Sequence, residues 1–183
     1  MSVHRLFLYT LLLATCHGQS VAWAAPGDAG GSSADASVIL VERMSFVKTA
    51  DLNFGRIIPS NGPGTVILAP DGTRTLTGGI ILASGESHPA GFAGYGRPNR
   101  IVTIRMGANR RLLKRAGGNE TMQIDTFIIG STPQTQLTAA PLSFRIGSSS
   151  GMFAFPLGAT LHVNARQAPG VYTGTFDVIL VYQ

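Results

Sequence analysis

Apolar and polar residues alternate along most of the chain, in short runs separated by turn residues. The runs cover residues 38–41, 44–47, 52–58, 65–69, 73–77, 79–84, 90–95, 101–106, 122–130, 142–146, 160–165 and 170–183. Aromatic and β-branched residues at period two predict strands, and turns roughly every 8–12 residues are typical of a β-sandwich or barrel. We therefore expect one all-β domain over residues 38–183.

The final run, residues 170–183, shows the strongest pattern. Pro169 and Gly170 supply a turn that begins it. We predict one continuous strand with a buried face formed by Tyr172, Gly174, Phe176, Val178, Leu180 and Tyr182. An apolar strand of this kind can be paired by a strand from a partner.

Two shorter segments carry local signals. Pro70-Asp71-Gly72 lies between two apolar or β-branched runs and predicts a hairpin turn. Residues 109–116, Asn-Arg-Arg-Leu-Leu-Lys-Arg-Ala before two glycines, predict two helical turns or, equally, a loop between strands.

The first 24 residues predict export. A basic start ending at Arg5, an apolar run over residues 6–14 and an Ala-Trp-Ala exit at residues 22–24 are typical of a signal peptide. The apolar run is far shorter than the roughly 20 residues of a membrane-spanning helix. We expect passage through the periplasm to the cell surface or the extracellular space. Alternatively, Cys16 in Leu-Ala-Thr-Cys is a lipoprotein cleavage site and carries a lipid.

Residues 25–37, rich in Gly, Ala and Ser, are expected to form a flexible arm before the domain. Cys16 is the only cysteine, so the processed chain has no thiol for a disulfide or a metal. After removal of Arg5 the net charge is about +4.

Much of the positive charge falls in one stretch without acidic residues. Its members are Arg97, Arg100, Arg105, Arg110, Arg111, Lys114 and Arg115. Such a cluster predicts either a solvated face or a surface that attracts anionic polysaccharide, lipopolysaccharide or phospholipid head groups. Nucleic acid is not expected as a partner, because the leader exports the chain and no aromatic-interleaved binding motif is present.

The sequence does not predict an enzyme. The processed chain has two histidines, His88 and His162, which are far apart in the sequence and lie near no convergent set of carboxylates. Ser87-His88-Pro89 lacks the glycine of a nucleophile elbow. We expect no catalytic residue, no metal and no cofactor.

Several short motifs stand near the start and the end of the predicted domain. These motifs are Leu52-Asn53-Phe54-Gly55, the runs 158–163 and 168–174, and the Val-Tyr-Gln ending. They resemble the bacterial domain family related to spore coat protein U and the archaic chaperone–usher pilins. Pilins of the wider class often have a glycine fourteenth from the C-terminus and a penultimate tyrosine, and Gly170 and Tyr182 occupy those places.

The resemblance implies an immunoglobulin-like sandwich that lacks one strand. A periplasmic chaperone and an outer-membrane usher would handle it, and the N-terminal segment of the next subunit would fill the gap. The arm 25–37 offers only alanines for this purpose, so Val38 and Leu40 are the alternative donors. The rival expectation is a self-complete secreted sandwich that binds an anionic surface polymer or glycan through the basic cluster.

Overall fold

The computed structural model describes residues 44–130 and 133–183, so the predicted signal peptide, the arm and the run 38–41 lie outside the described residues. The described part contains β-strands and no helix. Its strands are β1 (Ser45–Ala50), β2 (Ile57–Ile58), β3 (Gly64–Leu68), β4 (Arg74–Thr77), β5 (Ile81–Leu82), β6 (Ala90–Tyr95), β7 (Ile101–Met106), β8 (Arg110–Arg115), β9 (Thr121–Ile129), β10 (Thr135–Gln136), β11 (Leu142–Arg145), β12 (Met152–Val163), β13 (Tyr172–Thr173) and β14 (Val178–Tyr182).

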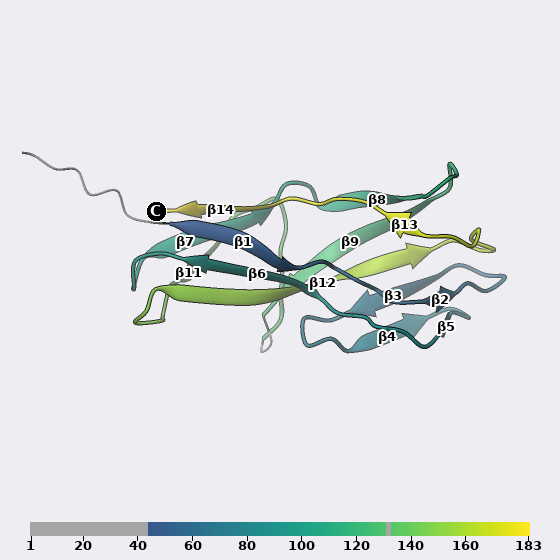
Figure 1. The fold of residues 1–183 in the computed structure, drawn as a ribbon, viewed down its shortest axis with the longest axis horizontal. Helices are drawn as coiled ribbons and strands as arrows, with labels where there is room; N and C mark the ends of the chain where they lie inside the picture. Colours follow the sequence, from purple (N-terminus) through teal and green to yellow (C-terminus); the bar gives the residue numbers. More distant parts are fainter. Residues whose placement is uncertain (1–43, 131–132) are drawn as a thin grey trace, which may run out of the picture. The chain divides into compact units, whose positions relative to one another are not determined.

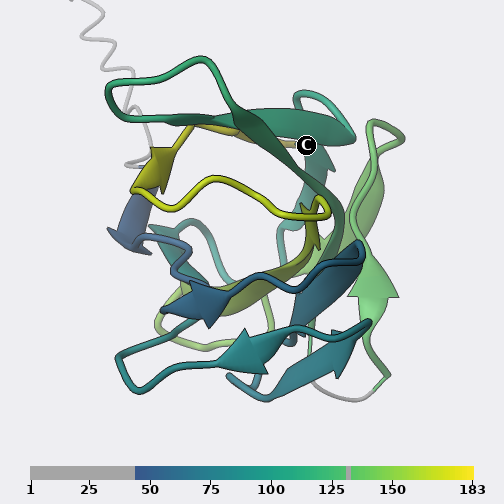
Figure 2. The ribbon, with the colours of Figure 1, turned by 90° about the vertical axis from the view of Figure 1, so that its right-hand side faces the viewer.

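These strands form two main sheets (Figure 1). The larger sheet has the order β1-β6-β12-β9-β8-β13, with β3, β4 and β10 attached. The smaller sheet has the order β11-β7-β14, and β2 pairs with β5. Seen along the strands, the sheets curl around a common interior (Figure 2).

The longest strand, β12, organises the larger sheet. Residues Met152–Leu157 pair with β6, and residues Ala159–Val163 pair with β3. The opposite side of β12 pairs with β9. Strands from distant parts of the chain therefore meet along one central strand.

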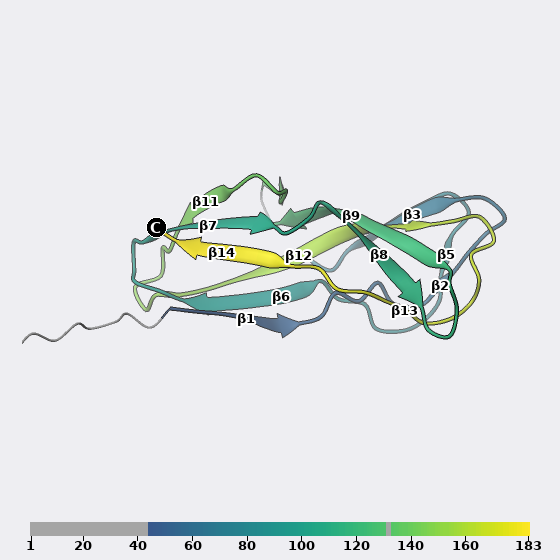
Figure 3. The same cartoon turned by 90° about the horizontal axis from the view of Figure 1, so that it is seen from above.

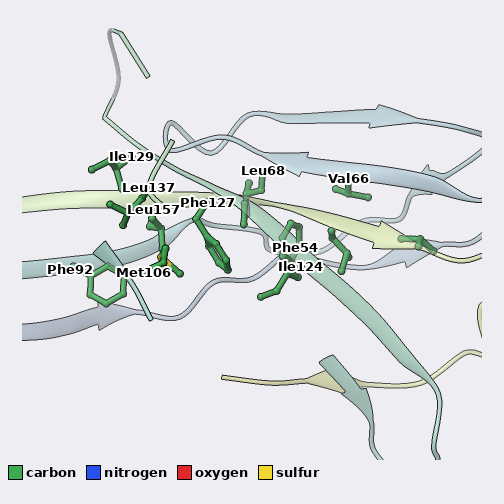
Figure 4. Close-up of a cluster of buried hydrophobic side chains, with 14 of the residues drawn as sticks. Phe54, Val66, Leu68, Phe92, Met106, Ile124, Phe127, Ile129, Leu137 and Leu157 are labelled. Carbon is green, nitrogen blue, oxygen red and sulfur yellow. The ribbon is translucent and has the colours of Figure 1, made fainter. Parts of the chain in front are cut away.

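Both sheets contribute side chains to one core. Ile104 and Met106 of β7 are fully buried, as are Phe127 of β9 and Leu157 of β12 (Figure 4). At one end Phe144 of β11 meets Phe153 of β12 edge to face, with ring centroids 5.5 Å apart. Side chains from two facing sheets make a sandwich core, and the expected all-β sandwich is confirmed.

The predicted hairpin turn at Pro70-Asp71-Gly72 is also confirmed. Ala69 and Thr73 close it, since the Ala69 amide donates to the Thr73 carbonyl at 2.9 Å. The Asp71 carboxylate accepts from the Thr73 amide at 2.9 Å, which lowers the pKa of Asp71 below its ordinary value. A side chain that hydrogen-bonds its own backbone two residues on is the signal that the sequence carried here.

The prediction for residues 109–116 was wrong. Arg110–Arg115 form β8, with side chains that alternate between exposed and half-buried positions. Strand β9 pairs with it over five residues, from Arg110 opposite Asp125 to Lys114 opposite Thr121. Tertiary pairing has overridden the helical preference of Leu, Lys and Arg, which is worth only a few tenths of a kcal/mol per residue.

Candidate assembly groove

Two strands, one at the edge of each main sheet, have an unpaired side. Among the described strands, β1 pairs only with β6 and β14 pairs only with β7. The two strands run in opposite directions at the same end of the sandwich (Figures 1 and 3). Unpaired N–H and C=O groups along such edges are a template for another strand.

Tyr182 connects these two edges at one end. Its hydroxyl lies 2.9 Å from the Ser45 carbonyl at the start of β1 and 3.0 Å from the Tyr95 carbonyl at the end of β6. Burial raises the pKa of the Tyr182 hydroxyl, so it stays protonated and can donate. The end of β14 is thereby fixed against the start of β1.

The chain segment that follows β1 and the one that precedes β14 line a cavity of about 650 Å³. One wall is the segment after β1, from Asp51 to Ile57, and the other runs from Gln167 to Gly174 and includes Phe176. Apolar side chains of the larger sheet form its floor: Leu113, Met122, Ile124, Leu161 and Val163. We call this cavity, together with the unpaired sides of β1 and β14, the assembly groove.

Aromatic side chains near β1 and β14 pack on the core without being fully covered. Phe46 of β1 stacks on Phe92, with centroids 5.5 Å apart, and on Phe155 at 6.0 Å. Phe176 contacts Phe127 at 5.2 Å and Phe92 at 6.5 Å. Phe46, Phe155 and Phe176 are only half-buried although they pack on the core. The core therefore leaves part of these three phenyl rings exposed to solvent.

The prediction of one continuous final strand was wrong. Tyr172–Thr173 pair with β8 in the larger sheet, whereas Val178–Tyr182 pair with β7 in the smaller sheet. Residues 174–177 cross between the sheets without strand pairing. Gly174 is exposed rather than buried, and a Cβ there would lie 2.7 Å from the Leu112 carbonyl oxygen, so the close approach requires glycine.

The structure distributes the predicted assembly residues between the cavity and β14. Tyr172, Phe176, Val178, Leu180 and Tyr182 are all half-buried. Tyr172 and Phe176 line the cavity, as does Gly170, and β14 carries the other three. The opposite wall could not be identified from the sequence, because Leu52, Phe54 and Ile57 belong to a run with the same apolar pattern as the other predicted strands.

Two arginines of the basic cluster hold the crossing segment. The Arg115 side chain donates to the Pro169 carbonyl at 2.8 Å and forms an ion pair with Glu120 at 3.2 Å. Arg111 forms an ion pair with Asp177 at 2.8 Å. Both side chains are about one-third exposed. Their contacts with Pro169 and Asp177 hold the chain just before β13 and just before β14.

The remaining members of the cluster do not share one surface. Arg110 and Lys114 are exposed on the opposite face of β8 from Arg111 and Arg115. Arg105 lies on β7, in the smaller sheet, opposite Ile179. Arg97 and Arg100 belong to the connection between β6 and β7. The single anionic-surface patch expected from the sequence is thus divided among several elements.

A polar cluster surrounds Asp125 at a bulge in β9. Its carboxylate accepts from His162 at 2.9 Å, from Gln123 at 2.8 Å and from Thr126 at 3.1 Å. Thr126 has a φ of 49°, and the register between β9 and β12 shifts beside it. Burial alone would raise the pKa of Asp125, but these hydrogen bonds outweigh it and the pKa lies below its ordinary value.

Replacing Asp125 with Asn is expected to destabilise the domain by about 1–2 kcal/mol at pH 5, because the bulge loses charge-assisted hydrogen bonds. The carboxylate's contribution is complete above the unfolded pKa of about 3.9 and is lost as the pH falls through the lower folded value. Urea unfolding of D125N and the wild type should therefore converge towards pH 2. Glu86→Gln, at an exposed site, is the control. A difference in unfolding free energy between D125N and the wild type that is as large at pH 2 as at pH 5 would contradict this account.

Within the described residues, no helix has the length and hydrophobicity needed to cross a membrane. The same residues bring together no group of three or more His, Cys, Asp or Glu side chains suited to a metal ion. The domain offers unpaired strand edges and a cavity with an apolar floor, which suit the binding of an extended chain.

The two sheets and the open side define an all-β sandwich domain with an accessible core. The chain belongs to the family described as Domain of unknown function (DUF4402), whose model matches residues 44–182. The match begins at the first described residue and ends inside the last strand, so it spans both walls of the groove. No curated protein matches the chain.

Proposed function

We propose that this chain is an exported, fimbria-like structural subunit that assembles by donor-strand complementation. In this proposal the sandwich is immunoglobulin-like with one strand missing, and a strand from another copy fills the assembly groove. The cavity, the unpaired edges of β1 and β14 and the half-buried aromatic rings on the core carry the proposal. Resemblance to chaperone–usher subunits supports a periplasmic chaperone and an outer-membrane usher as partners during export.

Physical chemistry favours a strand as the occupant. Unpaired backbone on both β1 and β14 can form ladders with an inserted chain, while the cavity and its apolar floor accept the inward side chains of that chain. Each Val, Leu or Ile buried in this way contributes about 1.5–3 kcal/mol before the cost of ordering. The empty groove would expose apolar surface and two edges, which promotes association in water.

The donor that the sequence offers is the run Val38-Ile39-Leu40-Val41. It is the only stretch of consecutive large apolar residues between the predicted signal peptide and β1. Alternation places Val38 and Leu40 on one face and Ile39 and Val41 on the other. One pair would face the core and the other would face solvent.

Cysteine pairing tests this proposal. Cys16 lies in the predicted leader, so the introduced cysteines are the only thiols of the processed chain that can form disulfides. We expect Leu40→Cys or Ile39→Cys, combined with Val47→Cys or Val181→Cys, to give disulfide-linked multimers after export, since neighbouring strands have Cα separations that suit a disulfide. Val47 and Val181 lie on β1 and β14 and are exposed.

The matched control pairs the same donor cysteine with Leu112→Cys, which is equally accessible on β8. Non-reducing gels should show multimers only for the groove positions. Disulfides formed within single chains, or multimers that appear equally with Leu112→Cys, would refute strand exchange between copies.

A further inference from the structure

The connections at one end of the sandwich form a single surface from distant parts of the sequence. The β6–β7 connection and the β11–β12 connection are joined by backbone hydrogen bonds. Asn99 donates to Ile146 at 2.8 Å, Ile146 donates to Arg100 at 2.9 Å and Gly96 donates to Gly151 at 3.0 Å. These bonds give the surface a fixed backbone, which reduces the ordering cost of binding a ligand there.

Two exposed arginines occupy this surface. Arg100 precedes β7, and Arg145 ends β11 opposite Ile101. The Arg145 guanidinium donates to the Asn99 carbonyl at 2.7 Å, which orients it and leaves its other N–H groups for a ligand. Neither arginine takes part in an ion pair with another described residue.

Acidic side chains are missing from the sequence that builds this end. Residues 87–119 and 126–176 contain no Asp or Glu, and these stretches supply β6, β7, β11, β12 and the two connections. Arg110 on β8, in contrast, lies opposite Asp125 of β9. Because these strands and connections carry no Asp or Glu, no side-chain carboxylate within them competes for Arg100 and Arg145, and the field of the two arginines acts on an anion in solution.

The neighbouring groups suit a carbohydrate. Tyr95, the last residue of β6, is 44% exposed and presents an aromatic surface where the β6–β7 connection begins. Gly151 has φ 78°, and a Cβ there would lie 3.3 Å from the Tyr95 ring, so the connection passes close to the ring. Ser149 and Ser150 are exposed on the same connection and can bond to hydroxyl groups.

We propose that this end of the sandwich binds an acidic polysaccharide of the uronate type. Carboxylates of the polymer pair with Arg100 and Arg145, a geometry that guanidinium groups favour. One sugar ring packs on Tyr95, where the aromatic surface loses its contact with water. The proposal goes beyond assembly and does not rest on it, because none of these residues lines the cavity.

The test measures binding of the full exported protein to immobilised polygalacturonate. Binding is measured at about 50 and 150 mM NaCl, because salt screens the attraction between the arginines and the polymer. We expect Arg100→Gln with Arg145→Gln to weaken binding about tenfold or more. Arg110→Gln with Lys114→Gln removes the same charge from β8 and should stay within about twofold. Thermal unfolding confirms that every variant is folded.

Tyr95→Ala, which leaves the charge unchanged, should weaken binding about threefold through the lost aromatic contact. Equal losses for both arginine pairs would show attraction by overall charge and overturn the site. Absence of binding to polygalacturonate would overturn it as well. Tighter binding to double-stranded DNA or to phosphatidylglycerol vesicles would assign the surface to another class of partner and reject the proposal.

Discussion

Replacing Phe176 with Asp is expected to prevent accumulation of the folded chain, which our proposal places in the periplasm during export. The Phe176 ring lies 5.2 Å from Phe127 and 6.5 Å from Phe92, so it joins the groove to the core. Loss of a packed phenyl ring costs about 3–5 kcal/mol, and a carboxylate on an apolar floor adds a desolvation penalty. A domain stabilised by roughly 5–15 kcal/mol does not retain its fold after such a loss when its groove is also open.

The measurement is the amount of soluble protein in periplasmic extracts, with thermal unfolding of whatever accumulates. Thr175→Asp is the matched control, because Thr175 is the exposed neighbour in the same unpaired segment. Phe176→Leu should accumulate, since it keeps an apolar group on the floor. A yield of soluble F176D equal to that of the wild type would mean that this segment does not close the core.

Introducing Asp at both Val38 and Leu40 is expected to abolish polymers while single subunits still fold. The change affects only the proposed donor run, which lies outside the described residues. A carboxylate that enters the groove must lose its water beside Phe176 and the apolar floor of the cavity, at a cost of several kcal/mol per charge. Donation should fail although the acceptor groove is unchanged.

Size-exclusion chromatography of the exported protein checks this result. The control places Asp at Ser33 and Ala36, which adds the same charge within the predicted flexible arm. The double variant should still accept the donor run of the wild-type chain when the two are expressed together, and mixed dimers would show it. Polymers of normal length from V38D/L40D would exclude this run as the donor.

Much of the strand content could be predicted because local patterns agree with the tertiary structure. Alternation over residues 101–106 matches the burial of β7, where Val102, Ile104 and Met106 are inaccessible and the residues between them are not. The Pro70-Asp71-Gly72 turn is encoded by its own side chain. Such features require no knowledge of distant residues.

Other features depend on partners that lie far away in the sequence. Strand β8 was predicted as a helix or a loop, because its pairing with β9 is invisible in its own composition. The continuous pattern over residues 170–183 concealed a change of sheet, since period two reports which face is apolar and not which strand lies alongside. Arg111 and Arg115 belonged to a run of positive charge, yet their partners Asp177 and Pro169 are more than 50 residues away.

The groove itself could be predicted only in part. The final strand identified one wall through Tyr172, Phe176 and Tyr182. The other wall, from Asp51 to Ile57, became apparent once the fold placed it across the cavity. Likewise, the arginine pair at the end of the sandwich combines Arg100 with Arg145, and only the bonds between two connections bring them together.

The most direct test of strand-exchanged assembly is a denaturing gel of the exported wild-type protein, run with and without boiling. A filled groove completes the core, so exchanged subunits should resist detergent until heat unfolds them. Our account predicts a ladder of multimers in the unboiled sample that collapses to one band after boiling. A single monomer band before boiling, from protein that is folded and soluble without a co-expressed chaperone, would contradict it.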